Sequence, residues 1–507
     1  MKQPKFKIEY KGDFLNGEFQ KPADPNGEWT VNSPACLSDS LGVLSFSYAH
    51  VDQAVASAKE AQRLWRKEKE SDRVAILKKY KEELTRRKDE IAECLAREVG
   101  KPLWEAETEV KAMIGKVDIT ANESLALVEE KTYPSITPTA NGRCAYRPLG
   151  VLAVIGPFNF PGHLPNGHIV PALMTGNSVI FKPSEKTPFV AQIMAECFEQ
   201  AGVPKGVFQV IQGEKEISRR LCTHEGVDGV LFTGSYEVGA AIKKDTLDHY
   251  WKLLALEMGG KNSAIVWKDA NLDAALRDAL VGAYITTGQR CSCTSRVFIH
   301  EAIQDEFISR FHERAKAFRI GHPFDQPFMG PLIDQASVDR YMKFQDIAPR
   351  EDAELVMRGK VLELEDPGYY VAPSITWMKK PTMDAIKKSI YQQTELFAPN
   401  VCFIPVKDEQ EAIEFSNATQ YGLVASIFTN SQSVYDSFRE ELDTGLINWN
   451  TTTVGASSKL PFGGTKKSGN HWPTALTATQ YCTHPVASLE VPDPSSEPPS
   501  FPGLEWK

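Results

Sequence analysis

The sequence predicts an α/β protein with parallel sheets, divided into two or three domains. At 507 residues the chain is too long for one simple core. From Gly150 onward, short apolar runs with Gly or Pro nearby alternate with stretches of helical spacing. A second alternation of the same kind begins near Ser263 and continues to about Gly464. Strands that alternate with helices are typical of βαβ units, in which the strands are parallel.

The segment before this alternation is predicted to be a scaffold helix. Ser71 and Asp72 precede apolar residues that recur at helical spacing, and Gly100 follows as a stop signal. The recurring residues are Val74, Leu77, Leu84, Ile91 and Leu95.

Four apolar runs predict the strands of the first sheet. They are Val151–Ile155, Ser178–Phe181, Val207–Ile211 and Gly229–Phe232, with a helix over Pro188–Gln200 among them. Ligands of open parallel sheets bind beyond the carboxyl ends of the strands. Asn159, Lys182 and Gly234 each fall near such an end, so the pattern favours a nucleotide site there.

The second alternation includes Ser295–His300 and Asn400–Pro405, and predicts a second α/β domain that carries Cys291. Between residues 129 and 147, Asn141-Gly142 is a turn signal flanked by strand-like residues, which predicts a hairpin. From Pro492 onward the chain is rich in Pro and Ser and is predicted to be an extended or mobile tail.

Composition excludes several classes of function. A hydrophobic content of 42% and a charged content of 24% are ordinary for a soluble globular protein. The net charge of −9 argues against a nucleic-acid binder and against binding to an anionic membrane. No apolar stretch of the signal-peptide type follows Met1, and the run near Val151 is too short to span a bilayer. Nine scattered cysteines favour reduced thiols, so we expect a cytoplasmic protein.

Cys291 and Glu257 are the strongest catalytic candidates. Cys291 lies on a segment that begins at Gly288, and Glu257 precedes Gly259-Gly260 at the end of a predicted strand. A thiol nucleophile needs a lowered pKa, and a carboxylate can later activate water. The pair suggests covalent chemistry on a carbonyl, with attack by sulfur followed by hydrolysis of a thioester. Alone, a Cys is more often a packed residue, and spacing does not choose between Cys291 and Cys293.

The surroundings of this pair resemble one known family. The ordered segments are Phe158–Pro161, Phe181–Glu185, Phe232–Ser235, Leu256–Lys261, Gly288–Cys291 and Pro461–Gly464. They are similar to motifs of the aldehyde dehydrogenases, and the resemblance runs from about Gly12 to about Glu490. Within that family, Pro161–His168, Ser468–His471 and the run from Tyr481 to Glu490 look like the succinylglutamic semialdehyde dehydrogenases.

The resemblance implies an aldehyde dehydrogenase-like fold and a catalytic trio. The fold would combine a doubly wound parallel-sheet cofactor domain, an α/β catalytic domain and a small β oligomerisation element. Cys291 would be the nucleophile, Asn159 the oxyanion donor together with the Cys291 backbone N–H, and Glu257 the general base. Without the resemblance, Asn159 would be interpreted as a turn residue. Glu257 could equally be a turn or surface residue, but its place after an apolar run, at a predicted strand end, favours function. The trio argues against a non-catalytic scaffold.

The resemblance also implies NAD as the cofactor. Gly-x-Gly-x-x-Gly is missing, but Gly234, Ser235 and Gly239 follow a predicted strand and open a helix, where N–H groups can approach a pyrophosphate. Lys182 and Glu185 would hold the adenosine ribose. The Glu185 carboxylate favours NAD over NADP, although Lys182 could accept a 2′-phosphate. Glu395 and Phe397 would lie at the nicotinamide ribose, and Ala398 replaces a family Gly there, which could shift the loop.

The substrate implied is N-succinyl-L-glutamate 5-semialdehyde, oxidised to N-succinyl-L-glutamate in arginine catabolism. The candidate donors of its pocket are Asn166, His168, Asn470 and His471. His163 and the other histidines lack metal-ligand spacing, so no metal is expected. Trp472 and Ser295-Arg296 stand where the subfamily usually has arginines. If Trp472 faces the pocket, another carboxylated or less anionic semialdehyde becomes the alternative substrate; a surface Trp472 would be neutral.

Domain boundaries follow from the same resemblance. We expect an NAD-binding domain over residues 1–128 and 148–257 and a catalytic domain over 258–465. An oligomerisation element is expected over 129–147 and 466–490, and a Pro-rich tail over 491–507. The family forms dimers or tetramers through that element, so a homo-oligomer with no nucleic-acid or membrane partner is expected.

Overall fold

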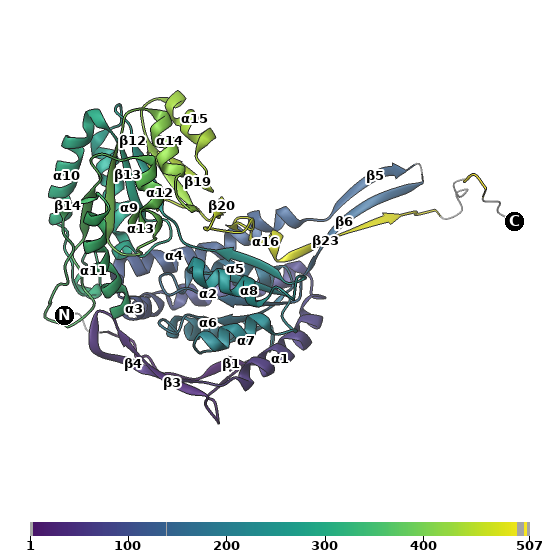
Figure 1. The fold of residues 1–507 in the computed structure, drawn as a ribbon. Helices are drawn as coiled ribbons and strands as arrows, with labels where there is room; N and C mark the ends of the chain where they lie inside the picture. Colours follow the sequence, from purple (N-terminus) through teal and green to yellow (C-terminus); the bar gives the residue numbers. More distant parts are fainter. Residues whose placement is uncertain (1–3, 138, 494–500, 504–507) are drawn as a thin grey trace.

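The fold consists of two seven-stranded sheets, each covered by helices, and a three-stranded sheet that projects from the body (Figure 1). The computed structural model describes residues 4–137, 139–493 and 501–503. Within these ranges, none of the helices has the length and apolar character needed to cross a membrane.

The first sheet has the strand order β11-β10-β7-β8-β9-β1-β2. Its five parallel strands are β7 (Val151–Ile155), β8 (Ser178–Lys182), β9 (Phe208–Val210), β10 (Gly229–Thr233) and β11 (Leu253–Glu257). The edge strands β1 (Asp13–Leu15) and β2 (Glu18–Gln20) are antiparallel. The chain runs outward from β7 in both directions, so the sheet is doubly wound and the order reverses between β7 and β10. The four predicted strands are confirmed within one residue at each end.

Helices bury both faces of this sheet. One face packs against α2 (Glu70–Arg86), α3 (Lys88–Val99), α4 (Leu103–Ile119), α5 (His163–Met174) and α6 (Phe189–Gln200). The other face packs against α1 (Ala49–Trp65) and α7 (Lys215–Thr223), and α8 (Tyr236–Asp245) follows β10. All five residues of β7 and of β8 are buried, as expected for parallel strands covered on both sides.

The second sheet has the order β14-β15-β16-β13-β12-β18-β19. Its strands are β12 (Asn262–Val266), β13 (Thr294–His300), β14 (Glu354–Met357), β15 (Ser374–Trp377), β16 (Asn400–Val406), β18 (Val424–Phe428) and β19 (Leu446–Trp449). Only the edge strand β14 is antiparallel to its neighbour. Helices α9 (Leu272–Tyr284) and α10 (Gln304–Lys316) cover one face, and α11 (Gln335–Arg350), α14 (Glu409–Asn417) and α15 (Gln432–Glu441) cover the other.

The projecting sheet has the order β23-β6-β5. It is built from β5 (Lys131–Thr137), β6 (Ala140–Pro148) and β23 (Thr483–Glu490). The predicted hairpin is present, but its predicted turn is wrong. Asn141 and Gly142 lie inside β6, because Thr137 pairs with Ala140 and the Asn141 side chain accepts the Ser135 N–H. The tail prediction falls mostly on residues 494–500 and 504–507, which lie outside the described ranges.

A helix break and a hairpin were not predicted from the sequence. The predicted helix over residues 71–100 is two helices, α2 and α3, separated at Arg87 (φ −99°, ψ 15°). Arg87 forms ion pairs with Glu90 and Glu196, which fix the break, and α3 ends at Gly100 in the predicted manner. The hairpin of β3 (Gly27–Ser33) and β4 (Cys36–Phe46) runs along the outside of the first half (Figure 1).

The remaining elements are short connections. They are α12 (Met383–Lys388), α13 (Ile390–Gln393), α16 (Ala478–Tyr481), β17 (Tyr421–Gly422), β20 (Pro461–Phe462), β21 (Thr465–Lys466) and β22 (Thr474–Ala475). The pairs β17–β21 and β20–β22 bring the segment before β23 back between the two halves.

One buried amide ties β23 to the first sheet. The Asn177 Oδ1 accepts the N–H of Gly150 at 3.0 Å, just before β7. Its Nδ2 donates to the carbonyls of Cys482 at 2.9 Å and Ala172 at 3.1 Å. The side chain is fully buried, so water cannot replace these partners.

We therefore predict that Asn177→Ala lowers the free energy of unfolding by about 2–4 kcal/mol, because it strands a buried N–H and buried carbonyls. The urea-denaturation midpoint measures the change. Asn122→Ala, at an exposed position, is the matched control and should leave the midpoint within error. Equal midpoints for the two variants would refute this role of Asn177.

Candidate active site

The candidate catalytic residues meet where the two sheets face each other. Glu257 is the last residue of β11, and Asn159 lies in the loop after β7, next to the point where strand order reverses. Cys291 lies in a turn between the 3₁₀ segment Ile285–Gly288 and β13. The Asn159 Nδ2 donates to the carbonyl of Gln289 at 2.8 Å, which joins the two halves directly.

The turn before Cys291 has an unusual backbone. Thr286, Thr287 and Gly288 have φ of +54°, +55° and +71°. A Cβ at Gly288 would lie 2.3 Å from the Ala398 carbonyl oxygen, so only glycine fits. The buried Gln289 holds the turn, because its Oε1 accepts the Ile333 N–H at 3.0 Å. The nucleophile therefore comes from a rigid turn rather than from a helix start.

Asn262 fixes the backbone on either side of the nucleophile. Its Nδ2 donates to the carbonyls of Cys291 at 2.6 Å and Cys293 at 2.9 Å. The Cys293 Sγ points at the Ile285 carbonyl, 3.8 Å away, and is buried, whereas Cys291 is partly exposed. Sequence reasoning missed Asn262, although its place directly after Gly259-Gly260-Lys261 was a usable signal.

The thiol of Cys291 is not activated in the way that the sequence analysis required. Burial raises its pKa to about 12, and the charges of Glu395 and Glu257 raise it further than Arg290 lowers it. This raised pKa is that of the protein without ligands. The physical reason is a site with little water and two carboxyl groups beside the sulfur.

Glu257 has the environment expected of a general base. It is 4% exposed, and burial raises its pKa well above the usual value, against a backbone N–H of Thr474 that donates to the carboxyl. Its Oε2 is buried without a hydrogen-bond partner. A Cβ at Gly463 would lie 3.0 Å from Oε1, so glycine leaves room beside the carboxyl group. The free oxygen can receive a water proton.

Asn159 is held by a buried ion pair. Its carbonyl accepts the Lys101 Nζ at 2.7 Å, and the same Nζ lies 2.7 Å from the Glu109 Oε2. The Glu109 Oε1 accepts the N–H groups of Gly162 and His163, each at 3.0 Å. Backbone and side chain of Asn159 are therefore fixed before any ligand arrives, as an oxyanion donor requires.

The segment predicted to bind a pyrophosphate is the N-terminus of a helix that follows β10. Ser235 is the N-cap of α8, and its Oγ accepts the Val238 N–H at 3.4 Å. A Cβ at Gly234 would lie 2.5 Å from the Phe232 ring, and one at Gly239 would lie 2.5 Å from the Met258 Sδ. Both glycines are thus required for close packing, and the helix end stays open to an anion.

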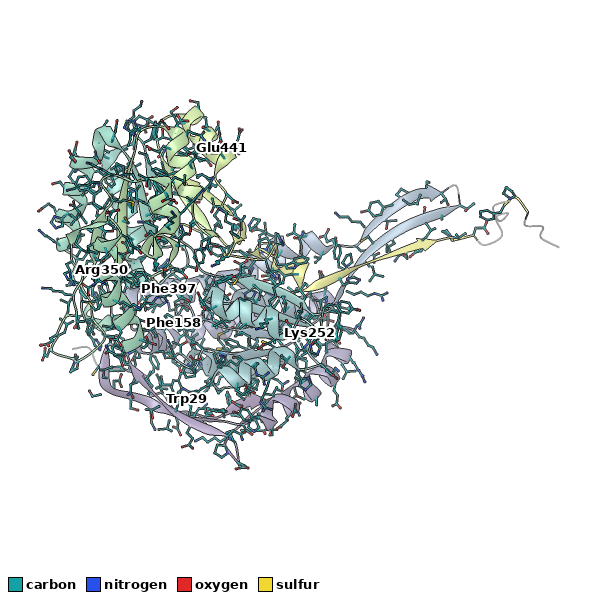
Figure 2. All side chains as sticks on the ribbon, in the orientation of Figure 1. Trp29, Phe158, Lys252, Arg350, Phe397 and Glu441 are labelled. Atoms are coloured by element: carbon teal, nitrogen blue, oxygen red, sulfur yellow. The ribbon has the colours of Figure 1, made fainter. Side chains whose placement is uncertain are left out.

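Lys182 and Glu185 stand at the neighbouring strand end. Lys182 ends β8 and is buried, and its Nζ lies 3.4 Å from the Glu185 Oε2. Burial lowers the pKa of Lys182, and Glu185 opposes that effect. Trp29 donates to the Glu185 carbonyl at 2.9 Å and anchors this loop (Figure 2). A ribose hydroxyl would find a cation and an acceptor here, so these residues fit a dinucleotide.

Glu395 lies beside the nucleophile's loop. Its Oε1 accepts the Gly260 N–H at 2.9 Å, and burial raises its pKa to about 7. Phe397 packs its ring edge-on against Phe158 at 5.8 Å between centroids (Figure 2). Ala398 does not require a shifted loop, because its φ is not positive; the residue with positive φ (+55°) is Phe397.

Three of the four candidate pocket residues, Asn166, His168 and Asn470, have other hydrogen-bond partners. Asn166 accepts the Tyr80 hydroxyl at 3.1 Å and donates to the Met113 carbonyl at 3.0 Å, fully buried. His168 contacts the hydroxyls of Tyr481 at 2.7 Å and Thr233 at 3.2 Å, and burial lowers its pKa to about 3.

The candidate pocket residues of the C-terminal segment are Asn470 and His471. Asn470 binds the edge of β11, with its Oδ1 on the Leu256 N–H at 2.9 Å and its Nδ2 on the Leu254 carbonyl at 2.8 Å. His471 is exposed, and Trp472 is 41% exposed. The buried Arg296 donates to the carbonyls of Lys261 and Ser416. The contacts of Asn166, His168, Asn470 and Arg296 favour structural roles over substrate binding.

No group of three or more His, Cys, Asp or Glu side chains suited to a metal ion occurs within residues 4–137, 139–493 and 501–503.

Comparisons with known proteins agree with this geometry. The model of the aldehyde dehydrogenase family matches residues 22–485. An N-succinylglutamate 5-semialdehyde dehydrogenase of Chromobacterium violaceum is 41% identical over 452 residues, covering 88% of this chain and 90% of that protein. One of Paraburkholderia xenovorans is 37% identical over 494 residues, covering 95% and 99%. Betaine aldehyde dehydrogenase of Staphylococcus aureus, solved in complex with NAD+, superimposes with a TM-score of 0.91 at 25% identity, covering 98% and 97%.

The environment of Cys291 generates a pH prediction. Without ligands, alkylation of Cys291 by iodoacetamide should rise with pH and reach no plateau below about pH 9, because the thiol stays protonated. Glu395→Gln and Glu257→Gln should each move the profile to lower pH, since removing a negative charge stabilises the thiolate. Mass spectrometry of the Cys291 peptide gives the rates. Glu363→Gln, at an exposed site, is the control, and a wild-type plateau below pH 8 would contradict the argument.

Proposed function

This chain belongs to the aldehyde dehydrogenase family, and we propose that it oxidises N-succinyl-L-glutamate 5-semialdehyde to N-succinyl-L-glutamate with NAD. The observation that carries the proposal is the junction of Cys291, Asn159 and Glu257. Asn159 is hydrogen-bonded to Gln289, two residues before the thiol, and the charge of Glu257 reaches the same thiol. The junction unites a nucleophile, a fixed N–H donor and a base.

The first half of the reaction is an acylation of Cys291. Its sulfur forms a bond to the aldehyde carbon, the thiol proton leaves to water, and the carbonyl electrons move onto oxygen. The second N–H of Asn159 and the Cys291 backbone N–H donate to that oxygen; one such donor is worth about 2.7–4 kcal/mol. When the carbonyl re-forms, hydride leaves the carbon and a thioester remains on Cys291. The bound dinucleotide supplies the hydride acceptor.

The second half is a hydrolysis directed by Glu257. Its unpartnered Oε2 takes a proton from water, and the water oxygen attacks the thioester carbonyl. The carbon–sulfur bond then breaks, the acid leaves and the thiolate returns. The raised pKa of Glu257 strengthens it as a base once it is ionised.

We assign the dinucleotide to Lys182, Glu185 and the α8 N-terminus at Gly234–Ser235. Glu185 is 40% exposed at its side chain and accepts hydrogen bonds only, so it repels a 2′-phosphate and favours NAD over NADP. Glu395 would hold the nicotinamide ribose after leaving the Gly260 N–H, and Phe397 would pack beside it.

Three further assignments belong to this proposal. The curated relatives support the substrate, and with it a step of arginine catabolism. Nine unpaired cysteines support a reducing cytoplasm. The projecting sheet β23-β6-β5, with its exposed β5, supports a homo-oligomer built through residues 129–147 and 466–490. We also propose that the cofactor domain ends at residue 257 and that the catalytic domain ends at residue 465.

The two half-reactions predict different kinetic defects for variants of Glu257 and Cys291. Glu257→Gln should release one equivalent of NADH per site in a burst and then stall, because the thioester forms but water is not activated. Cys291→Ala should show no burst while still binding NAD, and Cys293→Ala should remain active. Rapid-mixing absorbance measures the burst. A missing burst in folded Glu257→Gln would place Glu257 in the first half-reaction instead.

The substrate proposal predicts an order of kcat/KM. Succinylglutamic semialdehyde should exceed glutaric semialdehyde, and both should exceed hexanal, because a carboxylate can form charge-assisted hydrogen bonds that hexanal cannot. NAD should exceed NADP with each aldehyde. A hexanal value above every carboxylated semialdehyde would overturn the substrate, and a clear NADP preference would overturn the role of Glu185.

A further inference from the structure

Of three cations near the start of α5, the buried Lys101 and the partly exposed Arg290 have carboxylate partners, but within the described residues the buried Lys116 does not. Lys101 pairs with Glu109 at 2.7 Å, with both side chains fully buried. Arg290 pairs with Glu105 at 2.8 Å. Lys116, on α4, has only the Ala475 carbonyl as a recorded acceptor, at 2.7 Å, although it is 1% exposed. Within the described residues, Lys116 forms no ion pair, and a buried cation without a counter-charge is unusual.

An imidazole and an open space lie beside this cation. His163 and Gly167 are four residues apart on α5 and therefore share one face. The His163 Nδ1 is buried without a hydrogen-bond partner. Gly167 is buried, yet a Cβ added there would meet no atom within 4 Å. Helix α5 packs against α4, which carries Lys116, and against β22, which carries Ala475. Burial, followed by the charges of Lys116, Lys101 and Arg290, lowers the pKa of His163 to about 4.

The segments around this space also carry the catalytic candidates. The carbonyl that binds Lys116 belongs to Ala475, and the residue before it, Thr474, donates its N–H to Glu257. Arg290 directly precedes Cys291. The α5 face with His163 begins four residues after Asn159. Lys116 and His163 are therefore held by the same segments that hold Glu257 and Asn159.

We propose that Lys116 and His163 form a carboxylate subsite for the part of the substrate remote from its aldehyde. The Lys116 ammonium supplies the missing counter-charge, and neutral His163 supplies a ring N–H donor. The open space over Gly167 leaves room for the chain that links the carboxylate to the aldehyde. The subsite rests on the proposed oxidation of a carboxylated aldehyde, and Lys116 and His163 set its specificity.

Lys116→Met tests the proposal through a ratio of two substrates. We expect kcat/KM for succinylglutamic semialdehyde to fall about 10- to 100-fold relative to hexanal, mainly through KM, because a hydrogen bond to a charged group is lost. Lys116→Arg should recover much of the ratio, since it keeps the charge. Lys111→Met is the matched control, because it makes the same change at an exposed position of α4 and should leave the ratio unaltered.

Inhibition provides a second, independent measurement. N-succinyl-L-glutamate should inhibit hexanal oxidation competitively in the wild-type enzyme, and its trimethyl ester should not. Lys116→Met and His163→Leu should each raise the inhibition constant about tenfold or more. NAD binding and the urea midpoint confirm that the variants are folded.

The outcomes separate the subsite from the proposed function. An equal fall of both substrates in Lys116→Met, or unchanged inhibition constants, would assign Lys116 to holding Ala475 alone and overturn the subsite. A wild-type enzyme that prefers hexanal, yet loses carboxylate inhibition in Lys116→Met, would keep the subsite and overturn the substrate.

Discussion

The buried ion pair of Lys101 and Glu109 is the interaction on which the site depends. The Lys101 ammonium holds the Asn159 carbonyl, and the Glu109 carboxylate receives the first N–H groups of α5 at Gly162 and His163. Each charge is thus satisfied by the other and by backbone groups. Removing one partner of such a pair strands a buried charge at a cost of about 3–5 kcal/mol. The oxyanion donor and the start of α5 are consequently fixed together, and both inferred parts of the substrate pocket inherit their geometry from this pair.

The opposite wall of the site depends on glycines. A Cβ at Gly259 would lie 1.8 Å from the Glu395 Oε2, and one at Gly260 would lie 2.7 Å from the Cys291 carbonyl. The missing side chains let β11, the turn that carries Cys291, and Glu395 approach one another. Asn262 then locks this contact with two hydrogen bonds. One wall is therefore held by charge and the other by close packing, which suits a site where ligands must enter on one side only.

Alternating apolar runs were enough to predict the strands, because buried parallel strands leave a continuous apolar signal. The break at Arg87 and the position of the hairpin turn were not predictable, since ion pairs with Glu196 and pairing across β6 decide them. The catalytic trio came from motifs. The residues of the proposed carboxylate subsite could not be chosen from motifs, because a motif does not say which side chains of a helix are left without partners. Asn166 and His168 share a motif with His163, but only His163 has an unpartnered buried nitrogen. Lys116 carries no motif and reaches the site only through the packing of α4 on α5.

Protonation explains why an anionic substrate suits this pocket. Burial raises the pKa of Cys291, Glu257 and Glu395, so the thiol stays protonated at neutral pH and the two carboxyl groups carry less negative charge than exposed carboxylates would. The ammonium of Lys116 has no carboxylate to balance it; burial lowers its pKa to about 8, which still leaves most molecules charged at neutral pH. A carboxylate that binds there is attracted by a charge in a medium of low dielectric, where the attraction is stronger than in water. The same carboxylate raises the pKa of Lys116 and so stabilises the charged form that binds it. In the proposed subsite, substrate recognition and the protonation of Lys116 therefore reinforce each other.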